Sequence, residues 1–521
     1  MEKGKTVKKL FCTVSKSKAS YFTIFTFYVL SVSFSYSAVE ITADYENGKV
    51  WPGVKIKETA DKVVVDTGNI SAGKDLWFNF KITGCKGKTI VFNNMFASAV
   101  DNKYLHTVSY KPVTEFFNNS YEVTEPGIWA GYRYTFSHSF REDTAYVSFS
   151  FPATNTMLDN YMAKIKNDPL VGVQKLCDSA IYSLPVELIS VTDKSVDDKD
   201  KKTAFILSRE DALDSGGTLV MAGALRYLLS DDTMAKEIRK KFTFVFLPLL
   251  ARDGVKMGST NWPASEKGTV VEYFSYPSTF LYNEKRLKEV DALKAYVQNI
   301  KKNKKKIDVF HNLHSAQPGD STLFVRPNPG DAKSKDIIRE YCMNVRMDCL
   351  QHYIISNSDT SDSSKYLTRY MQRELGALAV HSQTDCYYNN AKRCENDYYT
   401  DGELLVKGIG RAFSVNLPED TPPVLYAGNV GKFFAKKGEK ITFDFFYRDL
   451  LERPAKDMKI VIGEKVYPVV LENGTHWKRG WEYKIEIPVE AETNDYYIEV
   501  SAGSTKRRLP ENGLLLGPYI K

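Results

Sequence analysis

Two aspartates, Asp211 and Asp214, stand three residues apart in the stretch SREDALDSGGTLVMAGALRYLLSDD, which spans residues 208–232. A predicted strand ends just before them, and an amphipathic helix follows. Carboxylates at such a point suit three roles. They can bind a divalent cation, they can remain from an active site, or Asp214 and Ser215 can cap the free N–H groups of the helix, whose positive end suits acidic groups. The residues alone leave these alternatives open.

The region from about residue 162 to residue 417 alternates apolar strands with helical stretches. This alternation is typical of an α/β domain with a mixed, mostly parallel central sheet. Functional groups in such sheets usually lie beyond the carboxyl ends of the strands, which is where the two aspartates stand. The predicted strands cover residues 203–208, 242–250, 307–314 and 376–382, and the predicted helices cover residues 218–230, 284–300, 336–351 and 402–413.

Two β-rich regions flank the predicted α/β domain, which we assign to residues 162–417. Residues 39–161 contain short alternating or aromatic-rich runs between Gly, Asn and Pro turns, which predicts an N-terminal β-sandwich. After a Pro-rich hinge the alternation returns, and residues 421–521 are predicted to form an immunoglobulin-like β-sandwich. A length of 521 residues agrees with about three domains.

Composition and charge exclude two classes of protein. A hydrophobic content of 43% with 13% aromatic residues excludes a disordered chain. The net charge of +7 is mild for 71 basic and 64 acidic residues, and it does not indicate a nucleic-acid partner. The one dense basic run, Lys301–Lys306, follows a predicted helix whose C-terminal carbonyl groups attract cations. An anionic partner is the alternative.

The N-terminal segment, residues 1–38, reads as a targeting signal. Several lysines precede the uncharged, apolar run Tyr21–Ala38, and small residues near its end offer a cleavage point. The run is also at the lower limit for crossing a bilayer, so an uncleaved type II signal anchor is the alternative. We therefore expect a protein that is secreted or held at the cell surface, with a possible membrane anchor at its N-terminus.

The cysteines are interpreted in the light of that route. Without Cys12, six cysteines remain, an even number that permits disulfides in an oxidising compartment. Cys386 with Cys394 is the favoured pair, because it would close a short polar loop, and buried free thiols are the alternative. Glycosylation sequons at Asn69, Asn118 and Asn473 agree with a secretory route.

Several blocks of the middle region resemble the zinc metallocarboxypeptidases of the carboxypeptidase A superfamily, most closely the cytosolic-carboxypeptidase-like branch. Residues 208–230 match a strand that ends in ARxHPGE and the helix that follows it. Residues 239–258 match RKKFxFxxxPxxNPDGVxxG, and NLHS at 312–315 matches DLHS. The blocks occur in family order between residues 160 and 415, so the resemblance implies the carboxypeptidase fold. That branch also carries a β-sandwich in front of the peptidase domain, which DLWFNF at 75–80 and the segment 146–165 resemble.

The resemblance also assigns chemical positions, and most of them have changed. Asp211, Asp214 and His314 fall on the three zinc ligands, which in the family are His, Glu and His. His381 falls on the general-base Glu. The substrate-binding positions are occupied by Asn261, Glu272 and Tyr273 in place of the family's Asn and Arg residues.

These exchanges predict the loss of zinc hydrolysis. Aspartates reach less far than His and Glu, and zinc bonds tolerate only about ±0.2 Å, so the resemblance implies no tightly bound zinc cofactor. Two carboxylates and an imidazole suit harder cations better. The missing arginines would have stabilised the developing negative charge in the reaction. The simpler interpretations are that His314 is a hydrogen-bonded pocket residue and that Arg209 and Arg252 pair with Asp211, Asp214 or Asp253.

The sequence thus predicts a metallocarboxypeptidase-like pseudoenzyme outside the cell that binds a protein, peptide or glycan ligand. The alternative is a divergent metallocarboxypeptidase or amidohydrolase with zinc or another divalent cation in an altered site, in which His381 serves as the base. A third interpretation assigns the function to the two flanking β-rich regions and leaves the middle domain as a spacer.

Overall fold

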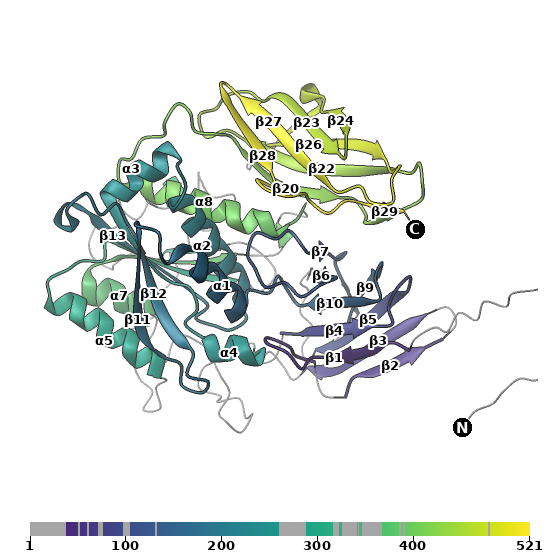
Figure 1. The fold of residues 1–521 in the computed structure, drawn as a ribbon, viewed down its shortest axis with the longest axis horizontal. Helices are drawn as coiled ribbons and strands as arrows, with labels where there is room; N and C mark the ends of the chain where they lie inside the picture. Colours follow the sequence, from purple (N-terminus) through teal and green to yellow (C-terminus); the bar gives the residue numbers. More distant parts are fainter. Residues whose placement is uncertain are drawn as a thin grey trace, which may run out of the picture. The chain divides into compact units, whose positions relative to one another are not determined.

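The computed structural model describes residues 38–520 with gaps, and these residues form one compact unit (Figure 1). The described ranges are 38–50, 53–59, 62–70, 77–96, 105–130, 133–259, 288–315, 322–325, 341, 343–345, 367–384, 387–388, 391–477 and 480–520.

The N-terminal part consists of strands in two five-stranded sheets, with the orders β1-β4-β10-β6-β7 and β2-β3-β5-β9-β8. Alternate residues of both sheets, such as Phe80, Phe92 and Val147, point into one shared hydrophobic core. The strands are β1 Glu40–Thr42, β2 Lys55–Glu58, β3 Val63–Ile70, β4 Asn79–Thr83, β5 Thr89–Phe96, β6 Thr107–Ser109, β7 Glu122–Val123, β8 Ile128–Ala130, β9 Arg133–Ser139 and β10 Thr144–Ser148.

The middle part contains a seven-stranded mixed sheet of order β11-β12-β14-β13-β15-β17-β16. Its four central strands, β14, β13, β15 and β17, run parallel, while the outer pairs are antiparallel. The predicted mixed sheet is therefore confirmed, although only three of its six strand pairs are parallel. The strands are β11 Val171–Asp178, β12 Pro185–Val191, β13 Lys202–Ser208, β14 Phe242–Leu247, β15 Val309–Ser315, β16 Thr322–Val325 and β17 Leu378–Thr384, with a small pair β18 Tyr387–Tyr388 and β19 Ala391–Lys392.

Helices cover both faces of this sheet (Figure 1). On one face Phe205 of β13 contacts Tyr296 of α5, and on the other Leu313 of β15 lies against Gly217 of α2. Side chains of opposite parity along parallel strands point to opposite faces, so α5 and α2 lie on opposite sides. The helices are α1 Asn155–Ile165, α2 Ser215–Leu228, α3 Thr233–Lys241, α4 Arg252–Met257, α5 Lys288–Lys302, α7 Leu367–Leu375 and α8 Glu395–Ala412.

Helices α2 and α8 approach each other through glycines. A Cβ added to Gly402 of α8 would lie 2.0 Å from the carbonyl oxygen of Val220, and one added to Gly223 of α2 would lie 2.2 Å from that of Tyr399. Only glycine permits backbones to lie this close. The spacing of these two helices matters for the site, because α2 begins directly after Asp214.

The C-terminal part again consists of strands. Two four-stranded sheets, β20-β22-β26-β25 and β24-β23-β27-β28, enclose one hydrophobic core, and β21 pairs with β29. The strands are β20 Val424–Val430, β21 Phe434–Ala435, β22 Lys440–Arg448, β23 Lys456–Ile462, β24 Lys465–Pro468, β25 Thr475–Trp477, β26 Gly480–Pro488, β27 Tyr496–Ala502, β28 Thr505–Leu509 and β29 Tyr519–Ile520. Short 3-10 helices occur at Asp198–Asp200 and Leu471–Asn473.

Candidate metal centre

Three neighbouring strands bring the predicted site residues to one edge of the sheet. Strands β13 and β15 are parallel, with Ser208 opposite Leu313, and β15 and β17 are parallel, with Asn312 opposite His381. The carboxyl ends of parallel strands meet at the same edge. The loop after β13, the end of β15 and the middle of β17 therefore lie side by side.

The loop from residue 209 to residue 214 turns sharply as it leaves β13. Arg209 adopts a left-handed backbone with φ 57°, which is uncommon for a residue with a side chain. The N–H of Asp214 then donates to the carbonyl oxygen of Asp211 over 3.0 Å. This tight turn places the two aspartates next to each other.

Asp214 occupies the N-cap position of α2, but its side chain forms no capping hydrogen bond. Its Oδ1 instead accepts a hydrogen bond of 2.9 Å from the backbone N–H of Ser315, at the end of β15. The carboxylate is thus turned toward the neighbouring strand and away from its own helix. The alternative that the Asp214 side chain caps the helix is therefore wrong.

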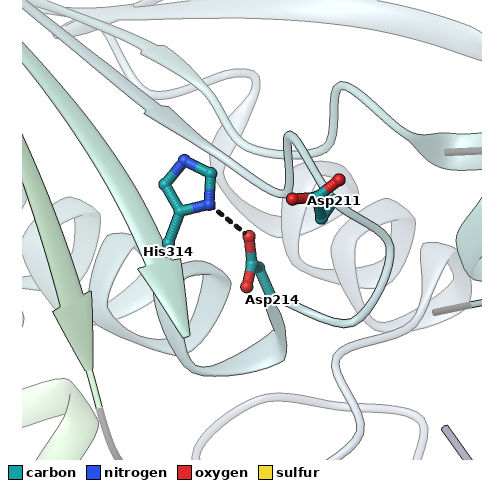
Figure 2. A group of neighbouring side chains, drawn as sticks. All are labelled: Asp211, Asp214 and His314. Atoms are coloured by element: carbon teal, nitrogen blue, oxygen red, sulfur yellow. Dashed lines mark ion pairs between the residues drawn. The ribbon is translucent and has the colours of Figure 1, made fainter. Parts of the chain in front are cut away.

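Asp211, Asp214 and His314 converge (Figure 2). Each offers one ligand atom, and these atoms lie within 4.8 Å of one another. His314 Nδ1 lies 2.7 Å from Asp214 Oδ2, and Asp211 presents a carboxylate oxygen toward this pair. His314 and Asp214 are buried, and Asp211 is partly buried. The structure therefore brings together the three residues that fall on the family's zinc-ligand positions.

Glu210 is a further member of the cluster, which the sequence analysis missed. Its Oε2 lies 3.2 Å from His314 Nε2 and accepts a hydrogen bond of 2.5 Å from Asn312 Nδ2. Both nitrogen atoms of the His314 ring thus face carboxylates. No signal in the sequence singles out Glu210, because its partners Asn312 and His314 lie on a different strand. These two residues are two apart and point to the same side of β15, so one neighbour contacts both.

The carboxyl groups and the imidazole of the cluster shift one another's pKa values. Burial disfavours the charged imidazole, but Asp214 and Glu210 raise the pKa of His314 well above its ordinary value. Burial and the neighbouring charge of Asp214 raise the pKa of Asp211 well above its ordinary value, against the opposing effect of His314. Three carboxyl groups around one imidazole therefore make a site that attracts a cation.

His381 lies beside the cluster, and its side chain is an imidazole where the family has the carboxylate of a Glu. Its ring stacks on that of His314, with the centroids 4.3 Å apart and the planes 24° from parallel. The residue predicted as a base is thus in contact with a predicted ligand. Asn261, Glu272 and Tyr273, which fall on the substrate-binding positions, lie outside the described residues.

The predicted ion pairs of two arginines are wrong. Arg252 pairs with Asp159 over 2.6 Å and donates to Asn155 over 2.9 Å, because it begins α4, which packs against α1. Asp253 accepts hydrogen bonds from Ser179 Oγ and from backbone N–H groups.

Arg209 is fully buried, and within the described part of the chain its guanidinium forms no hydrogen bond. It lies 6.0 Å from the centre of the Trp77 ring, a position that suits a cation–π contact. Burial lowers the pKa of Arg209 to about 9, with an opposing contribution from Asp214, so the group is charged at neutral pH.

The predicted disulfide between Cys386 and Cys394 is also wrong. Cys394 is a free thiol that occupies the N-cap position of α8. Its backbone N–H donates to the side chain of Asp397 over 2.8 Å, so the residue starts a helix instead of closing a loop. Cys386 itself lies outside the described residues.

Solved structures with this fold identify the class of protein. A metallo-carboxypeptidase from Burkholderia cenocepacia superimposes with a TM-score of 0.59 at 16% identity, covering 72% of this chain and 99% of the other. A metallo-carboxypeptidase from Pseudomonas aeruginosa, in complex with (2-guanidinoethylmercapto)succinic acid, gives a TM-score of 0.57 at 14% identity with the same coverage. The fold is that of the metallo-carboxypeptidases.

The sequence is similar to those of cytosolic carboxypeptidases. The chain is 24% identical to human cytosolic carboxypeptidase 2 over 243 residues and 22% identical to mouse cytosolic carboxypeptidase 3 over 242 residues. These matches cover 41% and 42% of this chain, but only 26% and 24% of the relatives. No protein-family model matches the chain. The chain is thus similar in sequence to the cytosolic carboxypeptidases and in fold to the metallo-carboxypeptidases, in agreement with the resemblance.

The expected secreted or cell-surface location is contradicted by these relatives. Their names describe cytosolic carboxypeptidases and not secreted ones. Lysines before an apolar run are a signal of composition only, and residues 1–37 lie outside the described ones. Glycosylation of the sequons was expected only for a secreted protein, so this expectation is no longer supported. In the described residues, no helix combines the length and the apolar character needed to cross a bilayer.

The described residues fit a divalent cation. Asp214 Oδ2 is buried and accepts no well-aligned hydrogen bond within the described part of the chain, although His314 Nδ1 is close to it. A buried, unsatisfied carboxylate oxygen is costly without a positive partner. Two carboxylates and one imidazole form a donor set that several divalent metals accept.

Proposed function

We propose that this protein is a divergent metallocarboxypeptidase that binds a divalent cation with Asp211, Asp214 and His314 and recognises the C-terminal end of a peptide, with hydrolysis largely lost. The observation that carries the proposal is the convergence of three ligand atoms within 4.8 Å at the edge of the sheet. The peptide ligand is inferred from the names of the relatives, which are carboxypeptidases.

The donor set supports a cation harder than zinc. Zinc sites are dominated by His and Cys, whereas carboxylate oxygens suit Mg²⁺, Ca²⁺ and Mn²⁺. Mn²⁺ accepts both oxygen and imidazole nitrogen, so it fits two aspartates and one histidine well. When bound, such a cation would polarise a carbonyl or carboxylate group of the ligand. It would also compensate the excess negative charge of Glu210, Asp211 and Asp214.

The exchanged residues around the site support the loss of hydrolysis. His381 stacks on His314, and no carboxylate is present at the general-base position. Asn261, Glu272 and Tyr273 supply no positive charge where the family has arginine. The loss of one donor to the developing oxyanion commonly costs about 3 kcal/mol of activation energy.

A second candidate function is residual hydrolysis with His381 as the base. The observation that favours it is the position of His381 next to His314, within reach of the same space. Histidine has a reference pKa near 6.5 and can accept a proton at neutral pH. A peptidase or amidohydrolase with an altered cation would result.

The flanking parts are proposed as separate β-sandwich domains, the C-terminal one immunoglobulin-like. Support comes from the two sheets and the shared core in each part. The solved metallo-carboxypeptidase structures match 72% of the chain, a larger share than residues 162–417 alone. A role of these domains in binding a protein or glycan partner stays a proposal as well.

The proposal is tested by cation and peptide binding. Chelator-treated full-length protein is titrated calorimetrically with Mn²⁺, Mg²⁺ and Zn²⁺. Peptides with a free or an amidated C-terminus are then added to the loaded protein. We expect one cation per chain, Mn²⁺ favoured over Mg²⁺, and binding of the free-carboxylate peptide alone.

Two results would contradict this function. Equal cation binding by the double variant Asp211→Asn/Asp214→Asn would exclude the proposed ligands, and the exposed double variant Asp197→Asn/Asp198→Asn is the matched control. Steady release of C-terminal amino acids from a peptide panel, abolished in His381→Asn, would establish the hydrolase instead.

A further inference from the structure

We infer that Glu210 is a positioning residue that holds the imidazole of His314 through Nε2, so that Nδ1 is the nitrogen presented to Asp211 and Asp214. The inference rests on the proposed cation site and adds a residue outside the predicted ligand set. The observation behind it is the pair of contacts on one carboxylate oxygen: Glu210 Oε2 lies 3.2 Å from His314 Nε2 and 2.5 Å from Asn312 Nδ2.

The two ring nitrogens of His314 have different surroundings. Nδ1 faces Asp214 at 2.7 Å on the side where Asp211 also lies (Figure 2). Nε2 lies 3.2 Å from Glu210 Oε2. Within the described residues Nε2 forms no well-aligned hydrogen bond, so its contact with Glu210 is an ion pair, and this pair leaves Nδ1 as the nitrogen on the side of the two aspartates. Metal-binding histidines commonly have such a partner on the nitrogen that does not bind the metal, and it also sets the orientation of the ring.

Asn312 explains why Glu210 stays in place. It lies two residues before His314 on β15, so both side chains leave the strand on the same side. The parallel register, with Ser208 opposite Leu313, then brings the residue after β13 next to both. The amide of Asn312 donates to Glu210, whereas an aspartate there would place two carboxylates against each other.

Residue 312 is an amide in this chain, and its Nδ2 donates to the carboxylate of Glu210. The block that resembles the family reads NLHS here where the family has DLHS, and this chain carries a carboxylate on the neighbouring loop instead. Glu210 is buried together with Asn312 and His314. A buried carboxylate persists only where it has partners, and both of its partners are members of this cluster.

The first test is the variant Glu210→Gln, which keeps the shape and removes the charge. We expect the Kd for Mn²⁺ to rise 10- to 100-fold, the usual effect of losing such an outer carboxylate. Glu237→Gln, an exposed change on α3 of the same domain, is the matched control and should leave the Kd within twofold. An unchanged Kd in Glu210→Gln would overturn the inference.

The second variant separates positioning from simple packing. Asn312→Asp should lower stability because it opposes two carboxylates, and Glu210→Gln/Asn312→Asp should restore stability by reversing the hydrogen bond. We expect the Kd of the double variant to stay at least tenfold above that of wild type, since His314 has lost its partner at residue 210. Recovery of affinity together with stability would reduce Glu210 to a packing role.

A spectroscopic measurement distinguishes failure of this inference from failure of the cation site. In the ¹⁵N spectrum of histidine-labelled, cation-free protein, we expect a protected Nε2 proton on His314 that is lost in Glu210→Gln. If wild type binds no cation but this signal behaves as expected, the proposed function is wrong and the positioning contact stands. If the cation binds and the signal is the same in both proteins, the positioning role is wrong.

Discussion

At the scale of single residues, Asp214 shows how one side chain can serve the fold and the site together. One of its oxygens accepts from Ser315 N–H and the other faces His314. The first contact joins α2 to the end of β15, and the second belongs to the candidate cation site. A substitution that keeps the first contact and weakens the second separates the two roles.

Asp214→Asn is that substitution. The amide oxygen still accepts from Ser315, so we expect the free energy of unfolding to change by about 1 kcal/mol or less. The lost negative charge should raise the Kd for Mn²⁺ at least tenfold, measured by calorimetric titration. Asp231→Asn, an exposed change at the other end of α2, should alter neither quantity. Unchanged affinity in Asp214→Asn would remove this residue from the ligand set.

His106 gives a second prediction at this scale, far from the site. It is buried, with Nδ1 3.0 Å from the carbonyl oxygen of Phe149 and its ring 4.2 Å from that of Phe136. Burial lowers its pKa to about 3, while the unfolded chain titrates near 6.5. Between these values the unfolded state binds the additional proton, so stability falls as the pH falls.

The His106 contribution can be isolated with His106→Gln, which retains a donor for Phe149. Each additional proton on the unfolded state corresponds to about 1.4 kcal/mol per pH unit. We expect urea unfolding between pH 6 and pH 4 to depend less steeply on pH in the variant, by about that amount. Parallel pH profiles of wild type and variant would show that His106 does take up a proton in the folded state.

The sequence predicted which residues form the site, but it did not predict the contacts between them. Asp211, Asp214 and His314 could be found because motif positions fix which residues follow which strand. Glu210 was missed because the motif leaves its position free, and its role becomes visible only when β15 lies beside β13. The partners of Arg209 and Arg252 were also wrong, since ion pairs depend on which elements pack together.

At the scale of elements, α8 carries a buried ion pair that links the middle and C-terminal parts. Glu403 Oε1 lies 2.7 Å from Lys407 Nζ one turn along the helix, and Oε2 lies 2.9 Å from Arg507 Nη2 on β28. Burial opposes the charge of Glu403, but Arg507 and Lys407 hold its pKa well below the ordinary value. Lys407 and Glu403 are buried, whereas Arg507 is partly buried.

Glu403→Gln should therefore destabilise the protein by about 3 kcal/mol, because the buried cation of Lys407 and the partly buried one of Arg507 lose their partner. The free energy of unfolding in urea is the measurement. The pair Lys164–Glu115 is exposed, and Glu115→Gln should cost less than about 1 kcal/mol. Wild type should also lose the Glu403 contribution as the pH falls below about 4.5, where the unfolded carboxyl group becomes protonated. A small effect of Glu403→Gln would contradict this account.

The elements themselves could largely be predicted. The runs at 203–208, 307–314 and 376–382 correspond to β13, β15 and β17, because strands buried on both faces have continuous apolar sequences. The outer hairpin of β11 and β12 was missed, since three of the eight residues of β11 are exposed and its sequence, VGVQKLCD, lacks a clear apolar pattern. It adds the antiparallel edge that makes the sheet less parallel than expected.

At the scale of the whole molecule, Arg141 joins the N-terminal part to the end of the chain. Its guanidinium lies between two aromatic rings, 4.2 Å from the centre of Tyr110 and 4.0 Å from that of Tyr519. It also donates to Glu122, a fully buried carboxylate, over 2.9 Å. Strand β29, which carries Tyr519, pairs in turn with β21.

Arg141→Met should loosen this junction. We expect hydrogen exchange of β29 and proteolysis in the Pro-rich segment 417–423 to increase several-fold, because the cation–π contacts and the ion pair are lost together. Arg133→Met, an exposed change on β9, should have no such effect. Equal exchange rates in Arg141→Met and wild type would show that the C-terminal part is held by other contacts.

Because of the glycine contact between α2 and α8, substitutions far from the proposed cation should also weaken cation binding. A methyl group added at residue 223 or 402 would overlap the backbone of the facing helix and force α2 and α8 apart. Since Asp214 is the N-cap residue of α2, moving this helix would displace Asp214 relative to Asp211 and His314. In a saturation screen for lost cation binding, these two glycines should score beside the aspartates, although neither comes near the bound ion.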